Sequence, residues 1–180
     1  SGRFTFNLSN ARNHPGIYRL SLDRNRWIDF INDDEDVEIV TDAKAVVDSL
    51  RVVRSESNSR YYSFRRLNQQ YKTKSELLQL VLARYPHDDP YYATTQTTIT
   101  EVQSNYSDFI SSATGANPQS FIARYIRSAQ LPAADLTQPP DKQLAYLKAH
   151  ALDQVDFTDE GLIRSDLFTS KAIEYLMYFR

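Results

Sequence analysis

The chain has 180 residues, a hydrophobic content of 41% and a formal net charge of −2 at pH 7, values typical of one packed domain or two small ones and not of a disordered tail. Acidic and basic residues are interspersed, so there is no basic stripe for nucleic acid and no polybasic membrane anchor, and no apolar run approaches the roughly 20 residues of a membrane span. The chain contains no cysteine, which excludes disulfides, thiol catalysis and thiolate metal sites within it.

Short strands are predicted in the first part of the chain, where apolar and polar residues alternate with the period of a half-buried strand. The apolar face of Ile17 to Leu22 carries Tyr18, Leu20 and Leu22. Residues 32–36 form an acidic loop that suits a hairpin connection. The predicted strands are Arg3 to Leu8, Ile17 to Leu22, Trp27 to Ile31, Val37 to Thr41 and Leu50 to Val53, with turns at Asn13 to Gly16 and Asp23 to Asn25.

One long helix is predicted from a start within Ser55 to Asn58 up to Tyr85. Short polar side chains at the start can cap the helix, and Pro86 ends it. The apolar stripe keeps its phase across Lys72 to Ser75, so no loop interrupts the helix. We expect its Phe64 end to meet the sheet and its Leu77 to Tyr85 end to be enclosed by later helices. The stripe consists of Phe64, Leu67, Tyr71, Leu78, Leu82 and Tyr85, and Leu77, Leu80 and Val81 widen it.

Further helices follow, and the first two of them have a start signal of the same kind. Asp89 caps and Pro90 opens the second helix, which ends at Gly115, and Asn117 caps a third, opened by Pro118. The second has the stripe Tyr92, Thr95, Ile99, Val102, Tyr106, Phe109, Ile110, Ala113, and the third has Phe121, Ile122, Tyr125, Ile126, Ala129. After a linker at Thr137 to Pro140, the pattern predicts helices at Asp141 to Leu152 and Phe168 to Phe179, with one helical turn at Leu162 to Arg164.

The predicted fold class is therefore α+β, with a small N-terminal antiparallel sheet followed by a helical bundle organised on one long helix. We assign residues 1–54 to an antiparallel β subdomain and residues 55–180 to an α-helical subdomain, which together form one continuous body. The last helix is apolar nearly all round, so we expect it to pack against a further part of a longer protein.

No catalytic, cofactor-binding or metal-binding residue is predicted. His14, His87 and His150 lack the spacing of a helical zinc pair and are interpreted as unrelated surface residues. The acidic loop at residues 33–36 lacks the alternating ligands and the central glycine of a calcium loop, which favours a solvated hairpin. No nucleophile elbow is present, and four glycines leave no phosphate-cradling loop.

Aromatic residues are the unusual feature of the composition, with twelve tyrosines. In the adjacent pairs Tyr61-Tyr62 and Tyr91-Tyr92, only one ring of each can face the core of a helical bundle. Most tyrosines are expected in the core, although the ring with its polar tip also suits partner surfaces. Trp27, beside the acidic loop, fits either a core position or a sugar- or peptide-binding site.

Several segments together resemble the N-terminal region of the TlpA-type, thioredoxin-like envelope proteins of the Bacteroidetes. The resemblance covers nearly the whole chain, and its motifs are structural. They are Gly16 to Leu20, Trp27 to Phe30, Val37 to Asp42, Asn117 to Ile126, Val155 to Phe157 and Arg164 to Thr169.

This resemblance implies an exported protein, often a lipid-anchored one, in the periplasm or on the outer membrane, in which a following thioredoxin-fold domain carries the Cys-x-x-Cys pair. The chain itself would be a non-catalytic accessory domain whose partners are that domain and a protein substrate. Two alternatives stay open. One is a carbohydrate- or peptide-binding module that uses exposed aromatic rings. The other is a hydrolase with two carboxylates in one cleft.

Overall fold

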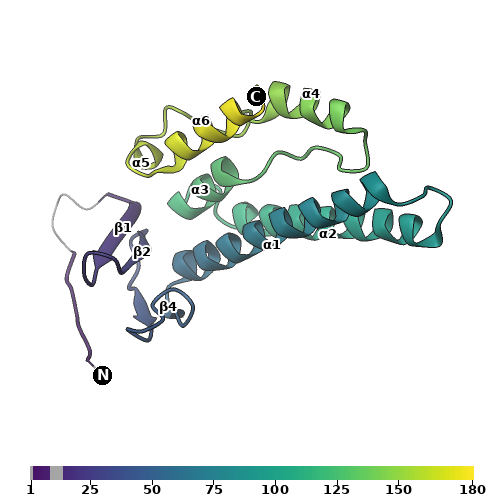
Figure 1. Ribbon diagram of the computed structural model, residues 1–180. Helices are drawn as coiled ribbons and strands as arrows, with labels where there is room; N and C mark the ends of the chain where they lie inside the picture. Colours follow the sequence, from purple (N-terminus) through teal and green to yellow (C-terminus); the bar gives the residue numbers. More distant parts are fainter. Residues whose placement is uncertain (1, 9–13) are drawn as a thin grey trace.

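The structure is a computed structural model that describes residues 2–8 and 14–180. The strands lie at one end of a long antiparallel pair of helices, and the remaining helices lie along one side of that pair (Figure 1). The predicted α+β class is confirmed. The elements are β1 (Gly16–Ser21), β2 (Trp27–Asn32), β3 (Glu38–Val40), β4 (Arg51–Arg54), α1 (Glu56–Arg84), α2 (Pro90–Gly115), α3 (Phe121–Ala129), α4 (Pro140–His150), α5 (Glu160–Ile163) and α6 (Leu167–Met177).

The β part consists of two separate two-stranded antiparallel ladders, β1 with β2 and β3 with β4. The hairpin that the acidic loop was expected to close, between Trp27 to Ile31 and Val37 to Thr41, is therefore wrong. β2 turns back on β1 through residues 22–26, where the Leu22 N–H donates to the Arg26 carbonyl at 2.8 Å. β3 instead pairs with β4 across a compact turn, in which the Thr41 hydroxyl donates to the Val46 carbonyl at 2.6 Å.

The predicted strand at Arg3 to Leu8 is also wrong, because these residues pair with no strand of the described chain. Phe4 is 80% exposed, so the apolar face that the alternation predicts is not buried against another element. The predicted turn at Asn13 to Gly16 lies partly outside the described residues, and β1 begins at Gly16.

Helix α1 begins and ends as predicted. Ser55 is its N-cap and accepts from the Asn58 N–H at 2.9 Å, and Tyr85, the residue before Pro86, is extended. The helix continues through Lys72 to Ser75 without a break. Its Phe64 end is buried near the strands, as predicted, but Leu77 is 60% exposed and Leu78 is only half-buried. The expectation that the Leu77 to Tyr85 end is the enclosed one is therefore wrong.

The core lies where α1, α2, α3 and β2 meet. The apolar stripe of α2 is confirmed by its buried residues, and Asp89 and Pro90 start that helix as predicted. Helix α3 starts at a different cap from the predicted Asn117, because Ser120 accepts from the Ala123 N–H. The buried cluster comprises Ile31, Tyr61, Phe64, Tyr71, Tyr106, Ile110, Ala113, Phe121, Ile122, Ile126, Leu162 and Leu167.

The C-terminal helices are fixed to this body by polar contacts. The Arg124 guanidinium of α3 donates to the Asp159 carboxylate at 2.6 Å, and Asp159 also caps α5. The buried Lys171 of α6 donates to the Gln130 carbonyl at 2.7 Å. In the described part of the chain, the helices are too short or too polar to cross a bilayer.

Candidate functional site

A groove of about 410 Å³ runs along the outer edge of β2. One wall is the edge of β2, the other is the turn between β3 and β4, and α1 closes one end. We name it the β2 groove. Its lining residues are Asn25, Arg26, Trp27, Ile28, Asp29, Lys44, Ala45, Val46, Val47, Asp48, Leu50, Tyr62 and Arg65.

Trp27 forms a fixed aromatic wall of this groove. The residue is 41% exposed, and the Arg19 guanidinium of β1 lies over its ring, 4.7 Å from the centroid. The same guanidinium donates to both Asp29 carboxylate oxygens, at 2.6 and 3.0 Å. A bidentate pair of this kind holds both side chains in one orientation. Trp27 is therefore presented to solvent in a defined position.

Tyr62 closes the end of the groove that faces α1. Its hydroxyl donates to the Asp29 carbonyl at 2.6 Å. Burial raises the pKa of Tyr62 well above its ordinary value, so the phenol is neutral and remains a donor at physiological pH. This bond attaches the middle of β2 to α1.

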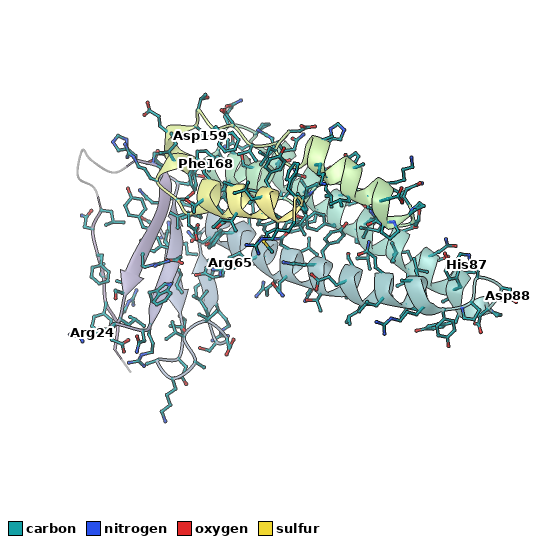
Figure 2. All side chains as sticks on the ribbon, turned by 45° about the horizontal axis from the view of Figure 1, so that its top comes forward. Arg24, Arg65, His87, Asp88, Asp159 and Phe168 are labelled. Carbon is teal, nitrogen blue, oxygen red and sulfur yellow. The ribbon has the colours of Figure 1, made fainter. Side chains whose placement is uncertain are left out.

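Two cations of the groove, Arg65 and Lys44, form no ion pair within the described residues. The Arg65 guanidinium lies over the Tyr61 ring, 5.5 Å from its centroid, at the junction of α1 with the strands (Figure 2). The other basic residue of the groove, Arg26, is paired with Asp23 at 2.5 Å. Of the two carboxylates in the groove, Asp29 is held by Arg19 and Asp48 has no ion-pair partner in the described chain.

The histidines lie in unrelated places. Within the described residues, no group of three or more His, Asp or Glu side chains could hold a metal ion. His87 stacks on Tyr92 at the tip of the α1–α2 pair, at the opposite end of the molecule from Arg24 in the β1–β2 turn (Figure 2). The His150 ring contacts Asp153 at 2.8 Å.

The acidic loop is more than the solvated hairpin predicted for it, because two of its carboxylates bind helix N-termini. Glu35 accepts from the Ser55 hydroxyl at 2.7 Å and from the Glu56 and Ser57 N–H groups at 2.9 and 2.8 Å. Asp33 accepts from the Phe121 N–H of α3 at 3.4 Å. The loop thus connects the strands to two helices. The sequence pattern excluded a calcium loop but did not indicate this capping role.

A second surface of interest is the outer side of α6. Leu167 and Lys171 face the core, whereas Ile173 and the two apolar residues three and four positions after it face solvent. We name Ile173, Leu176 and Met177 the α6 patch. Leu176 is 65% exposed. Contiguous exposed apolar residues of this kind mark interaction surfaces more often than isolated ones do.

The exposed aromatic rings are dispersed. Trp27 lies on β2, Tyr85 and Tyr91 contact each other at the α1–α2 tip, and Tyr146 lies on α4. The β2 groove brings only Trp27 and Tyr62 together. The alternation of residues 27–31 indicated a strand, but not which of its edges would be open, because that depends on pairing with residues distant in sequence.

Comparison with protein-family models, with curated proteins and with solved structures gives no match for this chain.

Proposed function

We propose that this chain is a non-catalytic interaction domain that accompanies a thioredoxin-like domain in an exported protein, in the periplasm or on the outer membrane. The observation that carries the proposal is the α6 patch, which is apolar and exposed on a helix whose opposite side is already buried in the core. The resemblance to the N-terminal region of TlpA-type envelope proteins supplies the partner, a thioredoxin-fold domain.

The arrangement of charged groups supports a binding role over a catalytic one. The Asp29 carboxylate is engaged by two bonds from Arg19, one to each of its oxygens. The hydrolase alternative needs two free carboxylates in one cleft, and in the β2 groove only Asp48 is outside an ion pair among the described residues.

The proposal is tested by photo-crosslinking in the native cell. A benzophenone amino acid at Leu176 should form a crosslink to a thioredoxin-fold domain, because that position lies in the α6 patch. The same amino acid at Glu101, an exposed position of α2, is the matched control and should form none. The proposal would be contradicted if the native gene encoded no Cys-x-x-Cys within a βαβ pattern, or if both positions gave the same crosslinks.

A second candidate function is peptide or carbohydrate binding, which the β2 groove favours because it is hollow and contains an immobilised tryptophan. The carbohydrate form of this candidate relies on several rings on one surface, and the exposed rings outside the groove lie on other elements. The peptide form is also supported by the backbone of β2, because an open strand edge can pair with an extended peptide.

A further inference from the structure

The backbone of β2 has a defined outer edge. Both backbone groups of Ile31 bind the Asn58 side chain, since its N–H donates to Oδ1 and its carbonyl accepts from Nδ2, each at 2.8 Å. Ile31 therefore directs its backbone groups away from β1. In an antiparallel ladder this direction alternates from residue to residue, so Asp29 and Trp27 direct theirs to the same side. The bond from Tyr62 to the Asp29 carbonyl agrees with this assignment.

Helix α1 covers only part of this edge. Asn58 and Tyr62 are one helical turn apart, about 6 Å along the axis, which matches the roughly 6.8 Å between Ile31 and Asp29 along a strand. Beyond Tyr62 the β2 groove begins. In the described part of the chain, the N–H and carbonyl of Trp27 and the N–H of Asp29 have no hydrogen-bond partner.

An open strand edge inside a groove can pair with another extended backbone. The opposite wall offers the exposed Val47 to apolar side chains, while Val46 beside it is buried. Two lining cations, Lys44 and Arg65, and one lining carboxylate, Asp48, are outside any ion pair in the described residues, so positive charge is in excess. The groove thus favours a peptide that is extended, partly apolar and acidic.

We propose that the β2 groove binds an extended acidic peptide segment as an added strand on the edge formed by Trp27 and Asp29. Backbone hydrogen bonds to these two residues hold the peptide, an apolar side chain packs on Val47, and an acidic side chain meets Lys44 or Arg65. The inference rests on the proposed function in that the partner is a protein, but it uses a different surface from the α6 patch.

The test begins with random short peptides displayed on phage and selected against the full chain. The selected sequences should be enriched in Asp and Glu. A synthetic copy of one of them should shift the backbone amide NMR signals of Trp27 and Asp29 in a saturable way. N-methylation of the peptide nitrogen that pairs with β2 should weaken binding about tenfold, because it removes one backbone hydrogen bond.

Variants of the chain provide the matched controls. Trp27→Pro removes the edge N–H and should weaken peptide binding, whereas Trp27→Ala keeps the N–H and should weaken it less. Arg65→Glu should reduce binding of the acidic peptide, and Leu176→Asp in the α6 patch should leave it unchanged. Loss of the α6 crosslink with intact peptide binding would count against the proposed function alone.

Several results would overturn the inference. One is a selection that yields no binder. Another is a peptide that shifts amides elsewhere but not those of Trp27 and Asp29. Equal binding by the N-methylated peptide would exclude strand pairing without depending on whether any variant folds. Saturable shifts of the same amides by oligosaccharides, without an effect of the peptide, would assign the groove to carbohydrate.

Discussion

At the scale of single residues, Ser55 and Glu35 form a hydrogen-bonded pair where the β part meets the helices. Ser55 has a φ of 132°, a region that glycine favours, so its conformation is strained. Its hydroxyl accepts from the Asn58 backbone and side chain and donates to Glu35. The network holds Ser55 in place at the exact residue where the β part ends and α1 begins. The carboxylate of Glu35 also satisfies two free N–H groups of the helix.

Replacing Glu35 by Gln should lower the free energy of unfolding by about 1 kcal/mol, since the negative charge at the helix N-terminus and part of the network are lost. Asp36→Asn is the matched control. Asp36 is exposed and pairs only with the exposed Arg54, so this change should cost less than about 0.5 kcal/mol. Urea denaturation at neutral pH measures both effects, and equal effects of the two variants would contradict the capping role.

The effect of Glu35→Gln on stability should depend on pH. Burial acts to raise the pKa of Glu35, but the hydrogen bonds from Ser55, Glu56 and Ser57 outweigh it, so the pKa lies below the ordinary value of 4.5. A carboxylate with a lowered pKa stabilises the fold fully above pH 4.5, and this stabilisation is lost as the pH falls through the folded-state value. The difference between the wild type and Glu35→Gln should therefore shrink as the pH is lowered from 4.5.

At the scale of elements, α1 shows both what the sequence can predict and what it cannot. Its start at Ser55 and its end before Pro86 follow from local chemistry, and both were predictable. Which part of its apolar stripe is buried depends on where α2 and the later helices lie. The wide apolar face near Leu77 therefore indicated burial that the fold does not provide.

The contrast between local chemistry and tertiary placement also explains what could be predicted of the β part and of the candidate site. Alternation in Arg3 to Leu8 indicates strand propensity, but a strand also needs a pairing strand, and neither ladder of the described chain includes these residues. Trp27 was recognised as a possible binding residue from its type alone. The groove around it depends on pairing between β1 and β2 and on two α1 side chains, which no local pattern encodes.

The two ends of α1 should differ in their contribution to stability. Phe64→Ala should lower the free energy of unfolding by about 3–5 kcal/mol, because it opens a cavity in the buried cluster. Leu77→Ala, on the same helix but largely exposed, should change it by less than about 0.5 kcal/mol. Equilibrium denaturation of both variants checks this. A loss of stability at Leu77 comparable to that at Phe64 would show that the C-terminal part of α1 is enclosed after all.

At the scale of the whole molecule, the division at residue 54 separates two kinds of structure that share one core. Ile31 of β2 is fully buried in the same cluster as Tyr61, Phe64 and Phe121 of the helices. The buried side chain of Asn58 replaces a neighbouring strand for β2. A two-stranded hairpin is marginal alone in water, so the β1–β2 ladder depends on this contact with the helical part.

The β part and the helices should therefore unfold in one transition. Trp27 is the only tryptophan and lies on β2, so its fluorescence reports on the β part, while far-UV circular dichroism is dominated by the helices. The two signals should give the same urea midpoint, as expected for two-state unfolding. In Asn58→Ala, which breaks both bonds to Ile31, the fluorescence transition should occur at a lower urea concentration than the dichroism transition. Asn105→Ala, at an exposed position of α2, is the control and should keep the two midpoints together. Separate midpoints in the wild type would show that residues 1–54 form an independent unit.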